Sequence, residues 1–172
     1  MPNLLKSQRS KSLKMSAKIL PSLLALFILS CAGIALSAEQ DLGRQQNMEA
    51  RRALTQATIL LKSGKPDQAN AFLKEKFPNG PPQGDLAVAY YRIIAGTPGG
   101  WDEARKGLEA LLKSDRRNLQ YALALDSLLG SKKETRDLAL KNLTELAGER
   151  KVDKQRVLQT WREVLNAQES SP

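Results

Sequence analysis

The sequence contains no histidine and a single cysteine, Cys31. Without imidazole, the ordinary zinc and haem sites and the Cys–His and Ser–His–Asp nucleophile systems cannot be built. One thiol also excludes a disulfide within the chain, and the acidic residues include no closely spaced set typical of a calcium loop. We therefore expect a protein that acts by binding other molecules, with no catalytic residues, no cofactor and no metal.

The net charge of +9 at first suggests a nucleic-acid or anionic-lipid partner. However, residues 1–38 hold five of the 27 basic residues and none of the 18 acidic ones, which leaves 22 against 18 (27 − 5 = 22) in the remainder. There the two signs are interspersed, as on a solvated helical surface. We therefore expect no nucleic-acid partner.

Residues 1–38 have the order of a secretory signal: a basic stretch, an apolar run over residues 19–29, and small residues up to Ala38. Cleavage after Ala38 is one route. Two alternatives stay open: lipidation of Cys31, whose preceding residues resemble a lipobox, and an uncleaved anchor over residues 19–38, which is about long enough to cross hydrocarbon. By each route we expect a periplasmic protein that contacts the membrane only through this segment.

A repeat of 35 residues follows the leader. Each unit carries an aspartate, an alanine two positions later and a leucine four positions after the alanine. Agreement at this many equally spaced positions indicates a real internal repeat. We interpret the aspartates as helix-start residues, because a negative charge is favourable at the positive end of the helix dipole. The three sets are Asp67, Ala69 and Leu73; Asp102, Ala104 and Leu108; and Asp137, Ala139 and Leu143.

Each unit is predicted to be a helical hairpin. In the first, Gly64 suits a left-handed helix end and Pro66 suits the first turn of the next helix. These positions resemble the tetratricopeptide repeat. We predict an all-α domain over residues 39–167, with about three repeats and a capping helix over 152–167, and a disordered tail over 168–172. The apolar face of the capping helix is formed by Val157, Leu158, Trp161, Val164 and Leu165.

An array of this type curls so that the first helices of the pairs line a concave groove, which can hold a peptide or a partner helix. Tyr90 and Tyr91 point about 100° apart on a helix, so one of them is expected in the core. For every groove candidate, ordinary packing or a solvated surface is the competing interpretation. The candidates are Arg51, Leu54, Thr58, Leu61, Tyr90, Tyr91 and Arg92.

Trp101, beside a Gly-Gly turn, has two interpretations. It can stack on a sugar ring, giving a weak polysaccharide contact, or it can wedge between helix ends. Aromatic residues make up only 5% of the chain, too few for a glycan-binding track, which favours the wedge. Asp102, Glu103 and Asp115 raise the idea of a glycosidase pair, but a helix-start role already accounts for Asp102.

The run YYRIIAGTPGGWDEARKGL over residues 90–108 is similar to the early repeats of the cellulose synthase operon protein C family. The preceding FPNGPP segment adds to this resemblance, which extends over about residues 45–165. It implies a periplasmic scaffold in bacterial cellulose or exopolysaccharide export, with polysaccharide synthase or export subunits of the cell envelope as protein partners. The family's outer-membrane barrel has no counterpart here, so the chain is not expected to be the export pore.

Two other functions stay open at this point. One is a general cell-envelope tetratricopeptide-repeat assembly factor or lipoprotein unrelated to polysaccharide, which lipidation of Cys31 would favour. The other is a polysaccharide-processing enzyme. This hypothesis would be excluded if the purified protein did not turn over cellulose oligomers.

Overall fold

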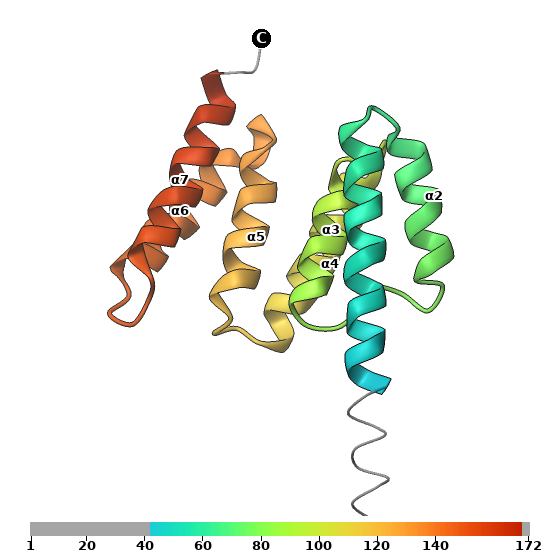
Figure 1. Cartoon of the computed structure of the whole chain (residues 1–172). Coiled ribbons are helices and arrows are strands. Elements are labelled where there is room, and N and C mark those ends of the chain that lie inside the picture. Colours follow the sequence, from blue (N-terminus) through green and yellow to red (C-terminus); the bar gives the residue numbers. More distant parts are fainter. Residues whose placement is uncertain (1–41, 170–172) are drawn as a thin grey trace, which may run out of the picture. The chain divides into compact units, whose positions relative to one another are not determined.

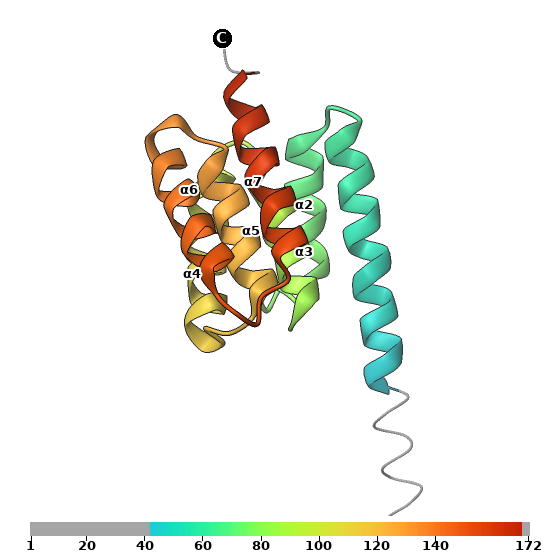
Figure 2. The same cartoon turned by 90° about the vertical axis from the view of Figure 1, so that its left-hand side faces the viewer.

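The computed structural model describes residues 42–169; the expected signal segment (residues 1–38) and residues 170–172 lie outside that range. The chain divides into two units, Met1–Gln45 and Gln46–Pro172, and the architecture below is that of the second. Its described part is helical, without strands (Figures 1 and 2). In this unit the first helix covers residues 46–62, and it is followed by α2 (Pro66–Lys76), α3 (Asp85–Ala95), α4 (Gly100–Ser114), α5 (Leu119–Gly130), α6 (Lys133–Gly148) and α7 (Lys154–Glu169).

The helices form three hairpins and a final single helix. The helix of residues 46–62 shares a hydrophobic cluster with α2, α3 packs on α4, and α5 packs on α6, while α7 lies against both α5 and α6. This confirms the predicted all-α repeat array of about three hairpins with a capping helix. That last helix ends at Glu169, two residues beyond the expected boundary. No helix between residues 42 and 169 is both long and apolar enough to cross a membrane.

The first hairpin turn is built as its glycine predicts. Gly64 has a φ of 72°, in the left-handed region that an L side chain adopts only with strain. Its N–H donates to the carbonyl of Leu61 at 3.1 Å, and the N–H of Lys65 donates to that of Leu60 at 3.0 Å. This bond pair is the Schellman end of a helix. The chain then enters α2 at Pro66, which fixes the hairpin.

Side-chain caps begin two of the later helices. Asn118 Oδ1 accepts hydrogen bonds from the backbone N–H groups of Gln120 and Tyr121 at 3.1 and 3.3 Å, at the start of α5. Asp153 Oδ1 accepts from the second and third residues of α7 at the same distances, 3.1 and 3.3 Å. Such a cap stabilises a helix by about 1 kcal/mol. These caps fix where the third hairpin and the last helix begin.

The interpretation of the three repeated aspartates as helix-start residues is right for two of them. Asp67 and Asp102 lie in the first turns of α2 and α4. α6 already begins at Lys133, so Asp137 lies beyond its first turn, which holds Glu134 instead. The cause is the short turn after α5, which lets α6 begin earlier than the other second helices.

The repeat is preserved in the core. In α2, α4 and α6, the alanine and the leucine four residues later are all at most 1% exposed. Alanine lets two helices approach closely at their crossing, and a buried leucine contributes about 1.5–3 kcal/mol. The core has two hydrophobic clusters, and α5 contributes to both. The larger runs from the first hairpin to α5 and α6, and the smaller consists of Leu123, Leu143, Val157 and Val164.

Candidate partner-binding groove

A cavity of about 650 Å³ opens on the side formed by α3, α5 and α7. These are the first helices of the second and third hairpins and the final helix, the surface that a repeat array presents to partners. We call this cavity the groove. It is lined by Tyr91, Arg92, Ala95, Gly96, Trp101, Leu108, Gln120, Leu123, Ala124, Ser127, Leu128, Ser131, Arg156, Gln159, Thr160 and Glu163.

α5 and α7 present equivalent faces to the groove. Adding 36 to the residue numbers of four lining positions in α5 gives four lining positions in α7. The repeat therefore extends into α7. The spacing from α5 to α7 is 36 residues, one more than the spacing of 35 between the second helices. The equivalent pairs are Gln120 and Arg156, Leu123 and Gln159, Ala124 and Thr160, and Ser127 and Glu163.

The lining of the groove is mixed in chemistry. Arg92 and Arg156 carry positive charge and Glu163 carries negative charge, a net of +1 (2 − 1 = +1). The amides of Gln120 and Gln159 add donors and acceptors, whereas the hydroxyls of Ser131 and Thr160 already donate to backbone carbonyls and can only accept. Such groups can hydrogen bond to the carbonyl and N–H groups of a polypeptide, and arginine can pair with its carboxylates. The groove is suited to binding a polar chain segment.

Two of the seven sequence candidates, Tyr91 and Arg92, line the groove. Their neighbour Tyr90 is instead buried in the core, as expected for one member of the tyrosine pair. Its ring makes edge-to-face contacts with Phe77 and Tyr91, with centroids 5.8 and 5.4 Å apart. The assignment of Tyr90 to the groove is therefore corrected, because its side chain is only 4% exposed and packs in the core against Phe77.

None of the four candidates from the first hairpin lines this cavity. Leu54 is buried in the core, with Ala57 one turn further along, so its assignment to an open surface is wrong. Thr58 Oγ1 donates to the carbonyl of Leu54 at 2.8 Å, and Leu61 packs against the core. Arg51 is exposed. A binding role for Arg51, Thr58 and Leu61 stays a prediction.

The position of Tyr91 depends on a close approach to α4. A Cβ added to Gly107 would lie 2.0 Å from the Cζ atom of Tyr91, so only glycine leaves room for the ring. Burial, and secondarily the charge of Glu103, raises the pKa of the Tyr91 phenol. The hydroxyl therefore remains protonated at neutral pH and can serve as a hydrogen-bond donor.

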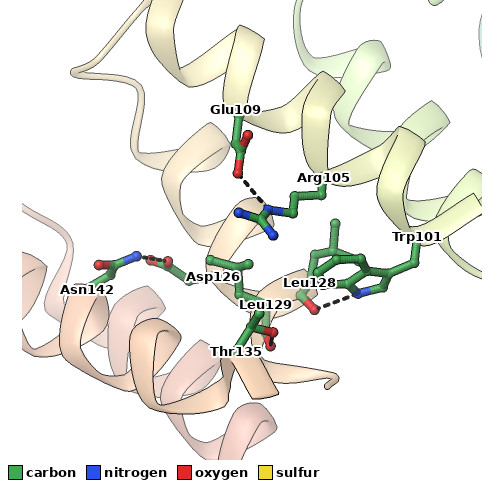
Figure 3. Close-up of polar contacts among 8 residues, drawn as sticks. All are labelled: Trp101, Arg105, Glu109, Asp126, Leu128, Leu129, Thr135 and Asn142. Atoms are coloured by element: carbon green, nitrogen blue, oxygen red, sulfur yellow. Dashed lines mark hydrogen bonds and ion pairs between the residues drawn. The ribbon is translucent and has the colours of Figure 1, made fainter. Parts of the chain in front are cut away.

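Trp101 ties the start of α4 to the end of α5 (Figure 3). Its indole Nε1 donates to the carbonyl of Leu128 at 3.3 Å and lies 3.2 Å from Ser131 Oγ. The Lys132 Nζ atom lies 3.8 Å from the centroid of the ring, within the range of a cation–π contact. The indole is thus engaged within the fold, as a wedge between helix ends.

A second cavity, of about 480 Å³, lies between α4, α5 and α6 and contains Asp126. Asp126 is 2% exposed, and its carboxylate accepts a hydrogen bond of 2.8 Å from Asn142 Nδ2 (Figure 3). Burial raises its pKa to about 6, although the hydrogen bond from Asn142 acts in the opposite direction. The sequence signal was a lone acid within the apolar stretch YALALDSLLG, which the repeat pattern does not single out.

The acidic residues considered for a glycosidase pair lie on the surface at the start and the end of α4. Asp102, Glu103 and Asp115 are exposed, and Asp102 and Glu103 belong to the first turn of α4. Between residues 42 and 169, no three side chains of the Asp, Glu, Cys or His types are grouped so that they could hold a metal ion. The groove is therefore the main candidate site.

Comparison with known proteins finds relatives named cellulose synthase operon protein C. Cellulose synthase operon protein C of Komagataeibacter sucrofermentans is 32% identical over 138 residues, which is 78% of this chain and 10% of that protein. The protein of the same name from Xanthomonas axonopodis pv. citri is 34% identical over 115 residues, or 66% of this chain and 7% of that protein. This chain therefore spans about a tenth or less of these relatives' length. No family model matches it.

A solved structure shares both fold and sequence. The flexible tandem repeat domain from the C subunit of bacterial cellulose synthase aligns with a TM-score of 0.53 and 29% identity, covering 66% of this chain and 56% of that one. The resemblance carried by residues 90–108 and their surroundings is thus confirmed. Through its helical repeats, the chain is a relative of the cellulose synthase operon protein C family.

Proposed function

We propose that this chain is a periplasmic protein-interaction scaffold associated with the synthesis and export of bacterial cellulose or a related exopolysaccharide. The observation that carries the proposal is the groove of α3, α5 and α7, found on a repeat array similar to that of cellulose synthase operon protein C. The proposal assigns binding to the groove and no catalytic step to the chain.

The chemistry of the groove supports a polypeptide partner. Its amide and hydroxyl groups match the donors and acceptors of an extended backbone, and its net charge favours a neutral or acidic segment. The proposed partners are the polysaccharide synthase or export subunits of the cell envelope. A polysaccharide contact would be secondary, because the indole N–H of Trp101 is already bonded to Leu128 and Ser131.

The proposed periplasmic location is supported by the signal-like order of residues 1–38. Three routes stay open for that segment: cleavage, retention as an anchor, or lipidation of Cys31. Mass spectrometry of the mature N-terminus would distinguish the three routes.

Affinity capture from the source bacterium tests the proposal. The full chain, tagged at its C-terminus, would be recovered from envelope extract and its partners identified by mass spectrometry. The groove variant combines Arg92→Glu, Arg156→Glu and Gln159→Ala. Tyr90 is left intact because it belongs to the core. The matched control also reverses two positive charges and truncates one glutamine, at exposed positions outside the groove: Lys106→Glu, Lys141→Glu and Gln68→Ala.

We expect the wild type and the control to recover a polysaccharide synthase or export subunit. The groove variant should lose this subunit while melting at the same temperature. Deletion of the gene should lower cellulose or exopolysaccharide production, and the groove variant should not restore it. Unchanged production together with capture of unrelated envelope proteins would refute the proposal and leave a general cell-envelope assembly factor as the better explanation.

A further inference from the structure

α7 has an apolar side that nothing in the described part of the chain covers. Its inward face places Val157 and Val164 in the smaller hydrophobic cluster. A second row of apolar residues on α7 is exposed to solvent. We call this row the outer stripe. It consists of Leu158, Trp161 and Leu165, which are 41%, 36% and 41% exposed.

The equivalent positions in α5 are covered. The offset of 36 residues that relates the groove faces of α5 and α7 also relates Leu125 to Trp161 and Leu129 to Leu165. Leu125 and Leu129 are only 7% and 2% exposed, and they share the larger cluster with Ala139 of α6. The outer stripe is therefore the side of α7 that corresponds to the side of α5 on which α6 packs.

α6 is bound to that side of α5 by polar contacts as well. Thr135 Oγ1 donates to the carbonyl of Leu129, and Asn142 Nδ2 donates to Asp126. A helix that closes a repeat array needs a polar outer face to remain soluble. α7 instead presents two leucines and a tryptophan, the composition of a surface on which another helix packs.

We propose that the outer stripe is a docking site for an amphipathic helix of a partner protein, which takes the position on α7 that α6 has on α5. The chain itself shows the pattern that fits such a position. Each of α2, α4 and α6 carries a fully buried alanine and a buried leucine four residues later. The docking helix should carry this pattern.

The rim of the stripe adds a preference for charge. Lys154 lies four residues before Leu158 and Arg162 four residues after it, so both lie beside the stripe on the helix surface. Acidic residues flanking the alanine and leucine of the partner helix would therefore be favoured, and binding should weaken as salt is added. This surface is distinct from the groove, so the inference does not depend on the function proposed for it.

The test uses a synthetic peptide with the sequence of residues 132–149, which contains α6, titrated into the full chain. Trp161 lies in the stripe, so its fluorescence should shift to shorter wavelength as the peptide covers it, and a Trp161→Phe variant should lose this signal. A peptide with Ala139→Glu is the control for the helix crossing. Leu158→Ser with Leu165→Ser removes the stripe, and Leu138→Ser is the matched control at another exposed leucine.

We expect saturable binding of the peptide. The double serine variant should weaken this binding by about tenfold or more while keeping the melting temperature of wild type, and Leu138→Ser should leave the binding unaltered. Equal binding of the Ala139→Glu peptide, or of the peptide to the double serine variant, would overturn the proposal, as would no binding at all. Self-association that the double serine variant abolishes, without peptide binding, would assign the stripe to a second copy. Binding to phosphatidylglycerol vesicles in place of the peptide would assign it to a membrane surface.

Discussion

Replacing Asp126 by Asn removes a buried negative charge from the middle of α5 while keeping the size of the side chain. The carboxylate accepts a hydrogen bond from Asn142 at 2.8 Å. Two basic residues, Lys113 and Arg116, line the same cavity, but within residues 42–169 neither forms an ion pair with it. The other charged residues lining the cavity are Glu109, Glu145 and Glu149. The charge of Asp126 is thus buried with little compensation.

The free-energy cost of burying this charge follows from the pKa of Asp126, which burial raises to about 6 from an ordinary value of about 3.9. A difference of about two pH units corresponds to at most about 3 kcal/mol. Between pH 4 and 6 the folded protein binds more protons than the unfolded chain, so the free energy of unfolding falls as pH rises through this window. The cost is absent below about pH 4 and fully present above about pH 6.

In Asp126→Asn the amide carries no charge, and its oxygen can still accept the hydrogen bond from Asn142. The new NH₂ group is buried without a hydrogen-bond acceptor, which lowers the free energy of unfolding by about 1 kcal/mol. We therefore expect the variant to be more stable than wild type by about 2 kcal/mol at pH 7.5, with a smaller or reversed difference at pH 4.5.

Urea unfolding followed by circular dichroism, at several pH values between 4.5 and 7.5, measures this difference. The other carboxylates titrate in both proteins, so subtracting the two curves isolates Asp126. Asn142→Ala is the companion variant, and losing its hydrogen bond should raise the pKa of Asp126 and move the stability change to higher pH. A difference between wild type and Asp126→Asn that stays constant with pH would refute the reasoning.

Three further substitutions test the packing. Ala104→Asp places a charge at a fully buried position of α4, so we expect the free energy of unfolding to fall by more than about 4 kcal/mol. A melting curve equal to that of wild type, followed by circular dichroism, would show that the repeat alignment is wrong. Gly107→Ala should cost about 1–2 kcal/mol because its methyl group meets the ring of Tyr91, yet gain up to about 1 kcal/mol in a Tyr91→Ala background. Urea denaturation of the four proteins of this double-mutant cycle measures the difference. An equal change in stability on Gly107→Ala with and without Tyr91 would contradict the contact. In Gly130→Ala the added Cβ would lie 2.4 Å from Val164 Cγ2, so amide hydrogen exchange should accelerate in α7 and remain unchanged in α4; unchanged exchange in α7 would count against tight packing there.

The features that could be predicted from the sequence are local or periodic. Gly64 and Pro66 mark a hairpin because their backbone geometry is intrinsic to the residue. The alanine and leucine of each second helix are found by their spacing, and all are buried. Asp137 shows what spacing alone does not predict. The buried alanine and leucine of α6 follow the period of 35, but the helix begins earlier because the preceding turn is short.

The facing of the first helices could be predicted only in part. Leu54 and Tyr90 were assigned to the groove but are buried, because the side on which a helix meets its neighbours depends on how three helices pack, and spacing within one helix does not determine that. The same limit applies to α7. The sequence groups Val164 and Leu165 on one apolar face, whereas the structure buries Val164 and exposes Leu165.

The central position of α5 affects how the domain comes apart. α5 contacts α3, α4, α6 and α7, whereas α2 contacts only α3 among the helices α3–α7. The two hydrophobic clusters meet in α5, which also forms one wall of the groove. α2 can therefore detach in a local opening that leaves the groove formed, while α5 cannot open without dissolving both clusters. A ligand held in the groove would slow proteolysis of the C-terminal helices more than that of the first hairpin.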